Sequence, residues 1–443
     1  MHFETTYRLE DFILNTRWED LPAAVQERMK GCFIDLMGAL VSGSRSAQFE
    51  AGLRLARTAF QPGDIPVVGT QERFGFLGAS AAMGHSSNAY DIDDGHNLIR
   101  AHPGTSFVGP VLAAAWQRDL KRSDFLTAML TAYETTIRMG AAIMDYYQYA
   151  HSSGTFGAVG TAAGVGRIFG FSREQLNNVL SVAEFNAPLV PGIRSVEYPS
   201  MNKDGVPFGV LAGILAVQDS LCGFTGNKHL LEADEYRHYL DDLGEKYEVL
   251  SLYFKPYPCC RWAHPAIDAC LGLLREHHLS WTDIAHVTVH TFRRATLLSK
   301  IVPQTADEAQ YNIAYPVAAA LVYGDFGTAQ VENLGDERVI GMMGKLTFAV
   351  DEALDAQFPQ HRICRAEIET ADGRRFLSGD CEPRGEAAEN IGVDWLCDKF
   401  RRITAAALTR EGQEAVLEAI TGEQDLPVRR IVETVNTPSY WKD

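Results

Sequence analysis

The sequence predicts a mainly α-helical protein of 443 residues with a smaller α+β domain towards its C-terminus. Two observations carry this prediction. From Leu21 to about Ser220, Ala, Leu, Met and Gly recur at the spacing of one helix face. Near residue 280 the pattern changes to alternating β-branched residues, which is typical of strands. The composition, 46% hydrophobic and 22% charged, is that of a globular chain with room for two or three domains.

Small residues mark the helices that we expect at the centre of the helical region. Residues 78–85 and 154–168 are rich in Gly and Ala, which allow two helix backbones to approach closely. Ser172 is followed three residues later by Gln175, and this capping-box pattern predicts the start of a helix. The apolar run from Gly205 to Val217 predicts another buried helix.

Strand patterns define the second domain. Residues 284–292 alternate in polarity, residues 364–377 indicate two strands around an Asp-Gly turn, and residues 345–350 indicate a third strand. Residues 311–322 and 332–342 read as helices between them. We therefore place the α+β domain at residues 275–393. The helical domain comprises residues 1–274, with the helical tail at 394–443 packing back onto it.

Charge and cysteine content exclude several classes of function. The net charge of −17 disfavours binding to nucleic acid or to an anionic membrane. We find no run of 18 apolar residues and no signal-peptide pattern at the N-terminus. The eight cysteines are scattered, without a CxxC pair or zinc spacing. We therefore expect a cytoplasmic, reduced protein without a metal.

The segment from Asn88 to Gly104 is the strongest candidate for a catalytic site. It combines Asp91, His96, Arg100 and His102 with two further aspartates, and Pro103-Gly104 then breaks the backbone. His and Asp side chains can act as acid and base, and an Arg side chain can bind a carboxylate of a substrate. The alternative is a solvated loop with helix caps.

Four further segments hold candidate residues, and a structural role is the alternative for them. His151 precedes Ser, Gly and Thr at the start of a Gly-rich helix, where those residues can also act as caps. Lys203 stands at the mouth of a small-residue helix and can be an ordinary exposed lysine. Arg261 and His264 follow a proline-rich loop, where Arg261 suits a bidentate carboxylate anchor. Tyr315 could donate to an enolate or simply pack in the core.

Motifs for common cofactors are missing from the sequence. There is no GxGxxG after a strand, no P-loop, no GxSxG and no HExxH. We therefore expect no nucleotide, flavin or zinc, and no other cofactor. Proton chemistry carried by side chains is the remaining interpretation.

Taken together, these segments resemble the MmgE/PrpD family, which includes 2-methylcitrate dehydratase, cis-aconitate decarboxylase and iminodisuccinate epimerase. The resemblance covers nearly the whole chain. It is carried by Asp91-Ile-Asp-Asp with His102-Pro-Gly, His151 before Gly154-Thr-Phe-Gly, Met201-Asn-Lys203, Gly223-Phe-Thr-Gly226, residues 255–265 (KPYPCCRWAHP) and Tyr315 before Ala318-Ala-Ala-Leu. The chain departs from the family pattern at Gly95-His96, where members often carry Thr, and it is shorter than expected for a dehydratase or decarboxylase.

The resemblance implies a large helical domain, a smaller α+β lid inserted before the last helices, and a homodimer. It implies a metal-free site in the cleft between the domains, formed by Asp91, His102, His151, Lys203 and Tyr315. Arg261 and His264 would be neighbours of that site. From the residue types of the 88–104 segment, we also expect Arg100 and His96 to contribute to substrate binding.

The predicted reaction is proton abstraction next to a carboxylate of a small polycarboxylate. His102 or His151 would take the proton, Lys203 and Arg261 would hold carboxylates, and Tyr315 would help to stabilise the enolate. Asp91 would orient a histidine or act as the second acid or base. A hydro-lyase of the 2-methylcitrate dehydratase type is the leading prediction. An epimerase of the iminodisuccinate type, a cis-aconitate-type decarboxylase and a non-catalytic dimeric polyanion-binding protein are the alternatives.

Overall fold

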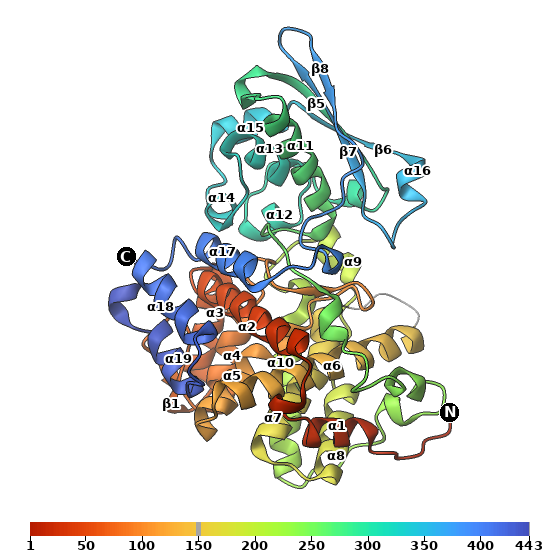
Figure 1. Cartoon of the computed structure of the whole chain (residues 1–443), viewed down its shortest axis with the longest axis vertical. Helices are drawn as coiled ribbons and strands as arrows, with labels where there is room; N and C mark the ends of the chain where they lie inside the picture. Colours follow the sequence, from red (N-terminus) through yellow and green to blue (C-terminus); the bar gives the residue numbers. More distant parts are fainter. Residues whose placement is uncertain (148–151, 443) are drawn as a thin grey trace.

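The computed structural model describes residues 1–147 and 152–442, and it divides into a helical body and a smaller α+β part. Figure 1 shows the helical body below and the α+β part above, with the C-terminal helices lying against the body. Buried apolar side chains form two large clusters, one in each part. The prediction of a mainly α-helical fold is confirmed.

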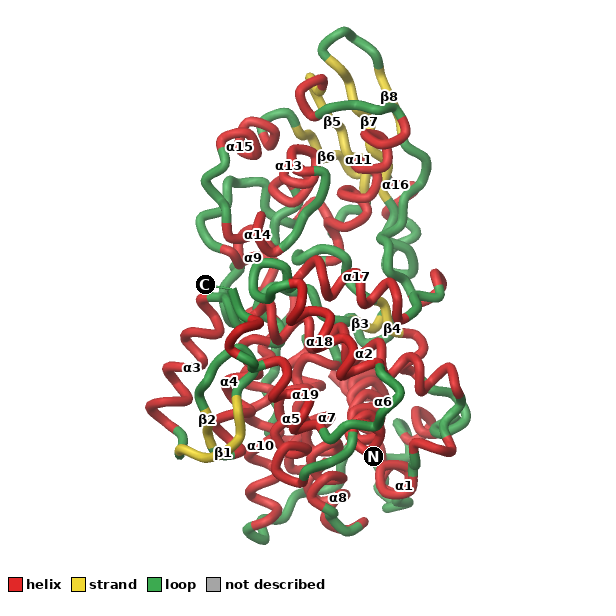
Figure 2. Tube along the Cα trace, turned by 60° about the vertical axis from the view of Figure 1, so that its left-hand side comes forward, coloured by secondary structure: helices red, strands yellow, loops and turns green. Residues whose placement is uncertain are grey.

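Helices from the first half of the chain build the body. They are α1 (Arg8–Asn15), α2 (Ala23–Gly43), α3 (Ala47–Ala59), α4 (Phe76–Ser86), α5 (Val108–Arg118), α6 (Arg122–Tyr147), α7 (Ser153–Phe169), α8 (Arg173–Phe185), α9 (Gly192–Glu197) and α10 (Val206–Leu221). Two small antiparallel pairs accompany them: β1 (Pro62–Pro66) with β2 (Arg73–Phe74), and β3 (Gly95–His96) with β4 (Leu252–Tyr253). The tube in Figure 2 shows how few strands the body contains.

The small-residue helix α7 lies at the centre of this body, in contact with α5, α6, α8 and α10. A Cβ atom added at Gly154 would lie 2.2 Å from the carbonyl oxygen of Gly205, and one at Gly209 would lie 2.3 Å from that of Gly154. Only glycine allows the start of α7 to approach α10 this closely. The predicted capping box of Ser172 and Gln175 is present at the start of α8.

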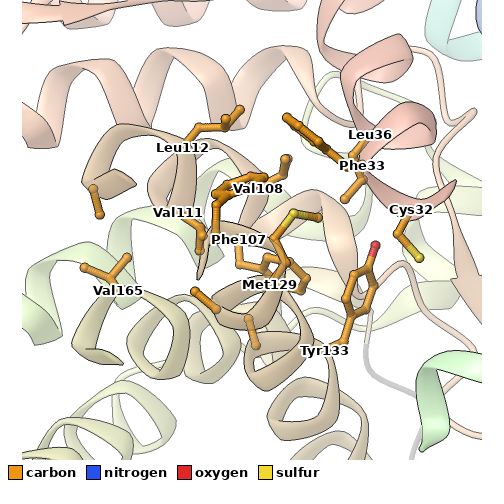
Figure 3. Close-up of a cluster of buried hydrophobic side chains, with 14 of the residues drawn as sticks. Cys32, Phe33, Leu36, Phe107, Val108, Val111, Leu112, Met129, Tyr133 and Val165 are labelled. Carbon is orange, nitrogen blue, oxygen red and sulfur yellow. The ribbon is translucent and has the colours of Figure 1, made fainter. Parts of the chain in front are cut away.

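The core beneath the 91–94 segment is apolar, and the hydroxyl of Tyr133 is a polar group at its edge. Figure 3 shows Phe33 and Leu36 of α2 facing Phe107, Val111 and Met129, with Tyr133 of α6 at the edge of the cluster. The ring of Tyr133 packs edge-on against Phe107. Its hydroxyl donates a hydrogen bond to Asp94, so this core is tied directly to the 91–94 segment.

The α+β part is built on a four-stranded sheet of order β6-β5-β7-β8. Its elements are α11 (His264–Glu276), β5 (Ile284–Thr291), α12 (Ala306–Gln310), α13 (Ala314–Tyr323), α14 (Thr328–Glu332), α15 (Glu337–Met343), β6 (Leu346–Val350), α16 (Glu352–Asp355), β7 (Cys364–Thr370) and β8 (Arg375–Leu377). The three predicted strand segments are confirmed. β5 pairs with β6 in parallel and with β7 in antiparallel orientation.

Helix α11 packs on one face of this sheet, against β7 and α13. Alternate residues of β7 are buried on that face, which explains the period-two pattern in the sequence. Since α11 ends at Glu276, it crosses the predicted boundary at 274/275 while contacting the sheet. The boundaries 1–274 and 275–393 stay a prediction.

The last helices return to the body. They are α17 (Val393–Ile403), α18 (Arg410–Thr421) and α19 (Val428–Val435), and α17 packs against α2 while α19 contacts α5. In Figure 1 they lie beside the earliest helices of the chain.

Three details differ from the expected elements. Tyr311 precedes α13, which begins at Ala314, because the polypeptide turns between α12 and α13. The expected helix at 332–342 is divided between α14 and α15. Helix α10 is not fully buried, because Phe208 and Leu215 are 59% and 48% exposed. No helix within the described residues is long and apolar enough to cross a membrane.

Candidate active site

A pocket of about 200 Å³ lies between the helical body and the α+β part. The body contributes the 91–102 loop, α9 and the turn before α10, and the α+β part contributes the segments around residues 261, 294, 311, 358 and 362. The lining residues are Asp91, Arg100, His102, Ser152, Gly192, Ile193, Val196, Asp204, Tyr253, Cys260, Arg261, Trp262, Arg294, Tyr311, Phe358 and Arg362. Of the predicted residues it gathers Asp91, Arg100, His102 and Arg261.

His102 lies between two carboxylates in this pocket. Its Nε2 is 3.4 Å from Asp91 Oδ1, and its Nδ1 is 3.3 Å from Asp93 Oδ2 and 2.7 Å from the carbonyl oxygen of Asp94. Burial by itself lowers the pKa of His102, but the charge of Asp93 raises that pKa well above its ordinary value. The raised pKa favours the protonated form of His102, in which both ring nitrogens are donors.

Lys255 completes the charge balance around Asp91. Its ammonium group is fully buried and lies 2.5 Å from Asp91 Oδ1. Burial raises the pKa of Asp91, although Lys255 and His102 oppose that shift. A carboxylate with a raised pKa is a better base than an ordinary one. The sequence motif that begins at Lys255 was recognised, but no role was predicted for this lysine.

Further buried charged groups contact the 91–94 segment on the side away from the pocket. Lys399 of α17 donates from Nζ to Asp35 Oδ1 at 2.5 Å and to the carbonyl oxygen of Ile92 at 2.6 Å. Asp94 accepts from the Gly104 amide at 3.1 Å, and burial together with Asp35 raises its pKa to about 7. The 91–94 segment is thus fixed by contacts to α2, α6 and α17.

Four arginines line the pocket, and they differ in their partners. Arg261 donates to Glu386 Oε1 at 2.8 Å and stacks over the ring of Tyr253. Arg362 donates to the side-chain oxygen of Asn97 at 3.0 Å. Within the part of the chain that the structure describes, no carboxylate forms an ion pair with Arg100, Arg294 or Arg362. Three guanidinium groups are therefore available to an anionic ligand.

Asp204 forms a second acidic point in the pocket. Its Oδ1 accepts from Ser152 Oγ at 2.5 Å, and its Oδ2 accepts from the Tyr311 hydroxyl at 3.1 Å. Neither Asp204 nor Tyr311 was predicted as a site residue. Asp204 follows the predicted Lys203 directly, and Tyr311 lies four residues before the predicted Tyr315. The direction of the side chains decides that Asp204 and Tyr311 line the pocket.

Lys203 and Tyr315 are not brought into the pocket. The Lys203 ammonium is buried and donates to Asp307, to Gln48 and to the carbonyl oxygen of Ala89. The Tyr315 hydroxyl donates to the carbonyl oxygens of residues 330 and 333, at 2.7 and 3.0 Å. These contacts satisfy both polar groups, and they give no support to the roles that were predicted for them. Lys203 instead borders a wider hollow beside α9.

The predicted histidines outside the pocket have structural partners. His96 Nε2 lies 3.5 Å from Glu248 Oε2, and His264 Nε2 lies 3.0 Å from the carbonyl oxygen of Cys259. Burial, with Arg261 nearby, lowers the pKa of His264 well below its ordinary value, so its ring stays neutral. His151 lies outside the described residues.

Two groups of side chains have the spacing of metal ligands. One ligand atom each of Asp91, His102 and Asp204 lies within 4.8 Å of the others, and Glu10, His229 and Glu232 form a second, fully buried group away from the pocket. In the first group Lys255 and Asp93 already neutralise Asp91 and His102. The absence of a metal cofactor stays a prediction.

Comparison with known proteins extends along the whole chain. The model of the MmgE/PrpD N-terminal domain matches residues 7–240, and that of the MmgE/PrpD C-terminal domain matches residues 257–423. A cis-aconitate decarboxylase-like protein of Aspergillus oryzae is 25% identical, over 94% of this chain and 93% of that protein. A cis-aconitate decarboxylase of Aspergillus terreus is 22% identical, over 96% of this chain and 94% of that protein.

Proposed function

Since the chain belongs to the MmgE/PrpD family, we propose that it catalyses proton transfer at a carbon next to a carboxylate of a small polycarboxylate. One observation carries this proposal: the imidazole ring of His102 faces a pocket that is lined by three guanidinium groups without carboxylate partners. Arginine is the side chain best suited to bind carboxylates, and a positioned histidine is the commonest acid or base.

The proposed roles follow from the charges around each group. Asp91, whose pKa is raised, takes the proton from the carbon. The negative charge that develops on the substrate carboxylate is stabilised by Lys255 and by Arg100, Arg294 and Arg362. His102 gives its proton to the leaving hydroxyl group, so that the carbon–oxygen bond breaks and water departs. This assignment makes His102 the acid, because its pKa is raised rather than lowered.

Dehydration, as in a hydro-lyase of the 2-methylcitrate dehydratase type, is the first reaction that we propose. Decarboxylation of a cis-aconitate-like substrate is the second candidate, favoured by the names of the two fungal relatives. In that reaction carbon dioxide leaves with no prior proton abstraction, and His102 protonates the carbanion. Reprotonation on the opposite face would give an epimerase. All three reactions need an acid next to bound carboxylates.

The experiment that tests the proposal uses EDTA-treated protein in D2O, incubated separately with 2-methylcitrate, cis-aconitate and iminodisuccinate and followed by proton NMR. A vinylic product from 2-methylcitrate supports dehydration, and loss of carbon dioxide from cis-aconitate supports the second candidate. Deuterium at the α-carbon of iminodisuccinate, with inversion, supports the epimerase. No reaction with any of the three would favour a non-catalytic polyanion-binding protein.

We also propose that the protein is a homodimer, as the family resemblance implies. Helix α10 exposes Phe208 and Leu215, and these lie on one helix face with Leu211 between them. Apolar side chains gathered on one face are typical of protein interfaces. A second copy of the chain is the partner that we propose for this face.

A further inference from the structure

Asp204 is a carboxylate of the pocket that lies within ion-pair distance, 4.0 Å, of no described Lys, Arg or His nitrogen. Asp91 lies 2.5 Å from Lys255 Nζ, and Asp93 lies 3.3 Å from His102 Nδ1. For Asp204, by contrast, no Lys, Arg or His nitrogen within residues 1–147 and 152–442 forms an ion pair. Burying an ionised carboxylate without a partner is costly. A further hydrogen-bond donor, supplied by the ligand, would lower that cost.

Asp204 is held in one orientation. Ser152 donates to Oδ1 and Tyr311 to Oδ2, so both oxygens are fixed by hydroxyl donors. Its backbone has a φ of 55°, in the left-handed region that residues other than glycine rarely adopt. Strained backbone of this kind collects at binding and catalytic sites. The residue is only 7% exposed, yet it lines the pocket.

Polar atoms of Asp204, Asp91 and His102 lie close together in the pocket. One atom of each lies within 4.8 Å of the others. Because a hydrogen bond to an oxygen spans about 2.8 Å, one oxygen or nitrogen atom of a ligand can contact Asp204 and His102 at once. That atom must carry a hydrogen for the carboxylate. A substrate carboxylate has none and would be repelled.

We propose that Asp204 is a specificity-determining residue that accepts a hydrogen bond from a hydroxyl or amino group of the substrate. The substrate is then a hydroxy- or amino-polycarboxylate, with its carboxylates on the arginines and its donor group on Asp204. This inference rests on the proposed function, and it separates the candidate reactions. A ligand without such a donor, such as cis-aconitate, leaves Asp204 with only the hydroxyl donors of Ser152 and Tyr311.

The same arrangement serves the proposed dehydration. A substrate hydroxyl that donates its hydrogen to Asp204 still presents an oxygen lone pair to His102. When the carbon–oxygen bond breaks, its electron pair stays on that oxygen, and the proton from His102 completes a water molecule. Asp204 binds and orients the leaving group, while no bond to Asp204 is made or broken.

A divalent cation is the other occupant to test, because the same three atoms have ligand spacing. The Lys255 ammonium at 2.5 Å from Asp91 already supplies positive charge there and would repel a metal ion. The experiment therefore includes an EDTA-treated sample.

The test compares matched ligands that differ only in the donor group. Citrate and propane-1,2,3-tricarboxylate share three carboxylates, and only citrate has a hydroxyl; malate and succinate form a dicarboxylate pair. We would measure their dissociation constants by calorimetry with EDTA-treated protein. The wild-type protein should bind the hydroxylated member at least about tenfold more tightly, as expected for a hydrogen bond to a charged group.

Asp204→Asn should reduce this preference to within about threefold, without weakening the ligand that lacks the hydroxyl, because the amide removes the charge and not the volume. Tyr311→Phe removes one donor that orients Asp204 and should lower the preference partially, which gives a second reading if Asp204→Asn folds poorly. Asp64→Asn, at an exposed position of β1 away from the pocket, is the matched control and should bind like the wild type.

Two results overturn the inference while the proposed function survives: equal binding of both members by the wild type, or a preference that Asp204→Asn retains. A preference for the hydroxylated ligand that appears only when a divalent cation is added also overturns the inference. In that case a bound metal ion, and not the ligand's hydroxyl group, would be the partner of Asp204. If none of the four ligands binds the wild type, the proposed function fails and the inference fails with it.

Discussion

At the scale of single residues, the site works through paired charges, and His102 is the most direct to test. Because the charge of Asp93 raises its pKa, His102 keeps its proton to a higher pH than an ordinary histidine does. If His102 is the acid, kcat/KM should fall as the pH rises through this raised pKa. In His102→Gln this fall of kcat/KM at high pH should disappear. The turnover number of the variant should be about a hundredfold lower than that of the wild type. A pH–rate profile checks both, with the exposed His361→Gln as control.

Two neighbouring arginines give a matched pair for substrate binding. Arg294 lines the pocket, whereas Arg293 pairs with Glu352 and Asp355 outside it. Arg294→Met should weaken polycarboxylate binding by roughly tenfold or more, the loss expected for a hydrogen bond between charged groups. Arg293→Met should leave the dissociation constant unchanged, and calorimetry compares the two. Equal effects from both variants would argue against a carboxylate at Arg294.

The raised pKa of Asp94 predicts that the free energy of unfolding depends on pH. Its pKa is raised to about 7 by burial and by Asp35, whereas an unfolded chain has about 3.9. The folded protein therefore binds the additional proton between these values, and its stability falls as the pH rises from about 4 to about 7. Asp94→Asn should flatten this slope in urea unfolding curves. An unchanged slope would show that Asp94 does not carry it.

At the scale of elements, α17 is fixed to the body by a buried ion pair. Lys399 donates to Asp35 and to the carbonyl oxygen of Ile92, and so joins the C-terminal helices to the 91–102 loop. Lys399→Met leaves a buried carboxylate alone and should cost about 3–5 kcal/mol of unfolding free energy, while Lys399→Met with Asp35→Asn should recover much of it. Arg410→Met, which removes an exposed pair with Glu414, should cost at most about 1 kcal/mol. Denaturant unfolding measures all three.

Most elements could be predicted because their patterns are local. The strands at 284–291 and 364–377 were readable from alternation, and the cap at Ser172 from two residues. The split at α14 and α15 could not be read in this way. Helix propensity is a weak signal over short segments, and packing against α12 and α13 decides where these helices end.

At the scale of the whole molecule, the proposed dimer face makes one prediction. Phe208→Glu with Leu215→Glu should convert a dimer to a monomer, because two charges on the exposed face of α10 would have to be buried against a second copy. Light scattering after size-exclusion chromatography measures the mass. Ile301→Glu, which changes a still more exposed apolar residue of the α+β part, should leave the assembly intact. A monomeric wild-type protein would contradict the proposal directly.

The two hydrophobic clusters place the site between them, and this arrangement decided which candidate residues meet. The 91–102 loop comes from the body, while Arg294 and Arg362 come from the α+β part, and no local pattern links them. The Asp-rich segment and Arg261 could be found from sequence because unusual residue types cluster there. Arg294 and Arg362 could not, since single arginines on a chain are ordinarily surface residues.

The sequence by itself determined the helical class, the sheet of the second part, the family, and the segment that carries Asp91 and His102. These follow from periodicity and motif order, which are properties of neighbouring residues. Only the tertiary structure decided that Tyr311 and Asp204 line the pocket while Tyr315 and Lys203 bind elsewhere. The reason is geometric: residues one to four positions apart leave a turn in different directions, and the packing of the two parts fixes which direction faces the ligand.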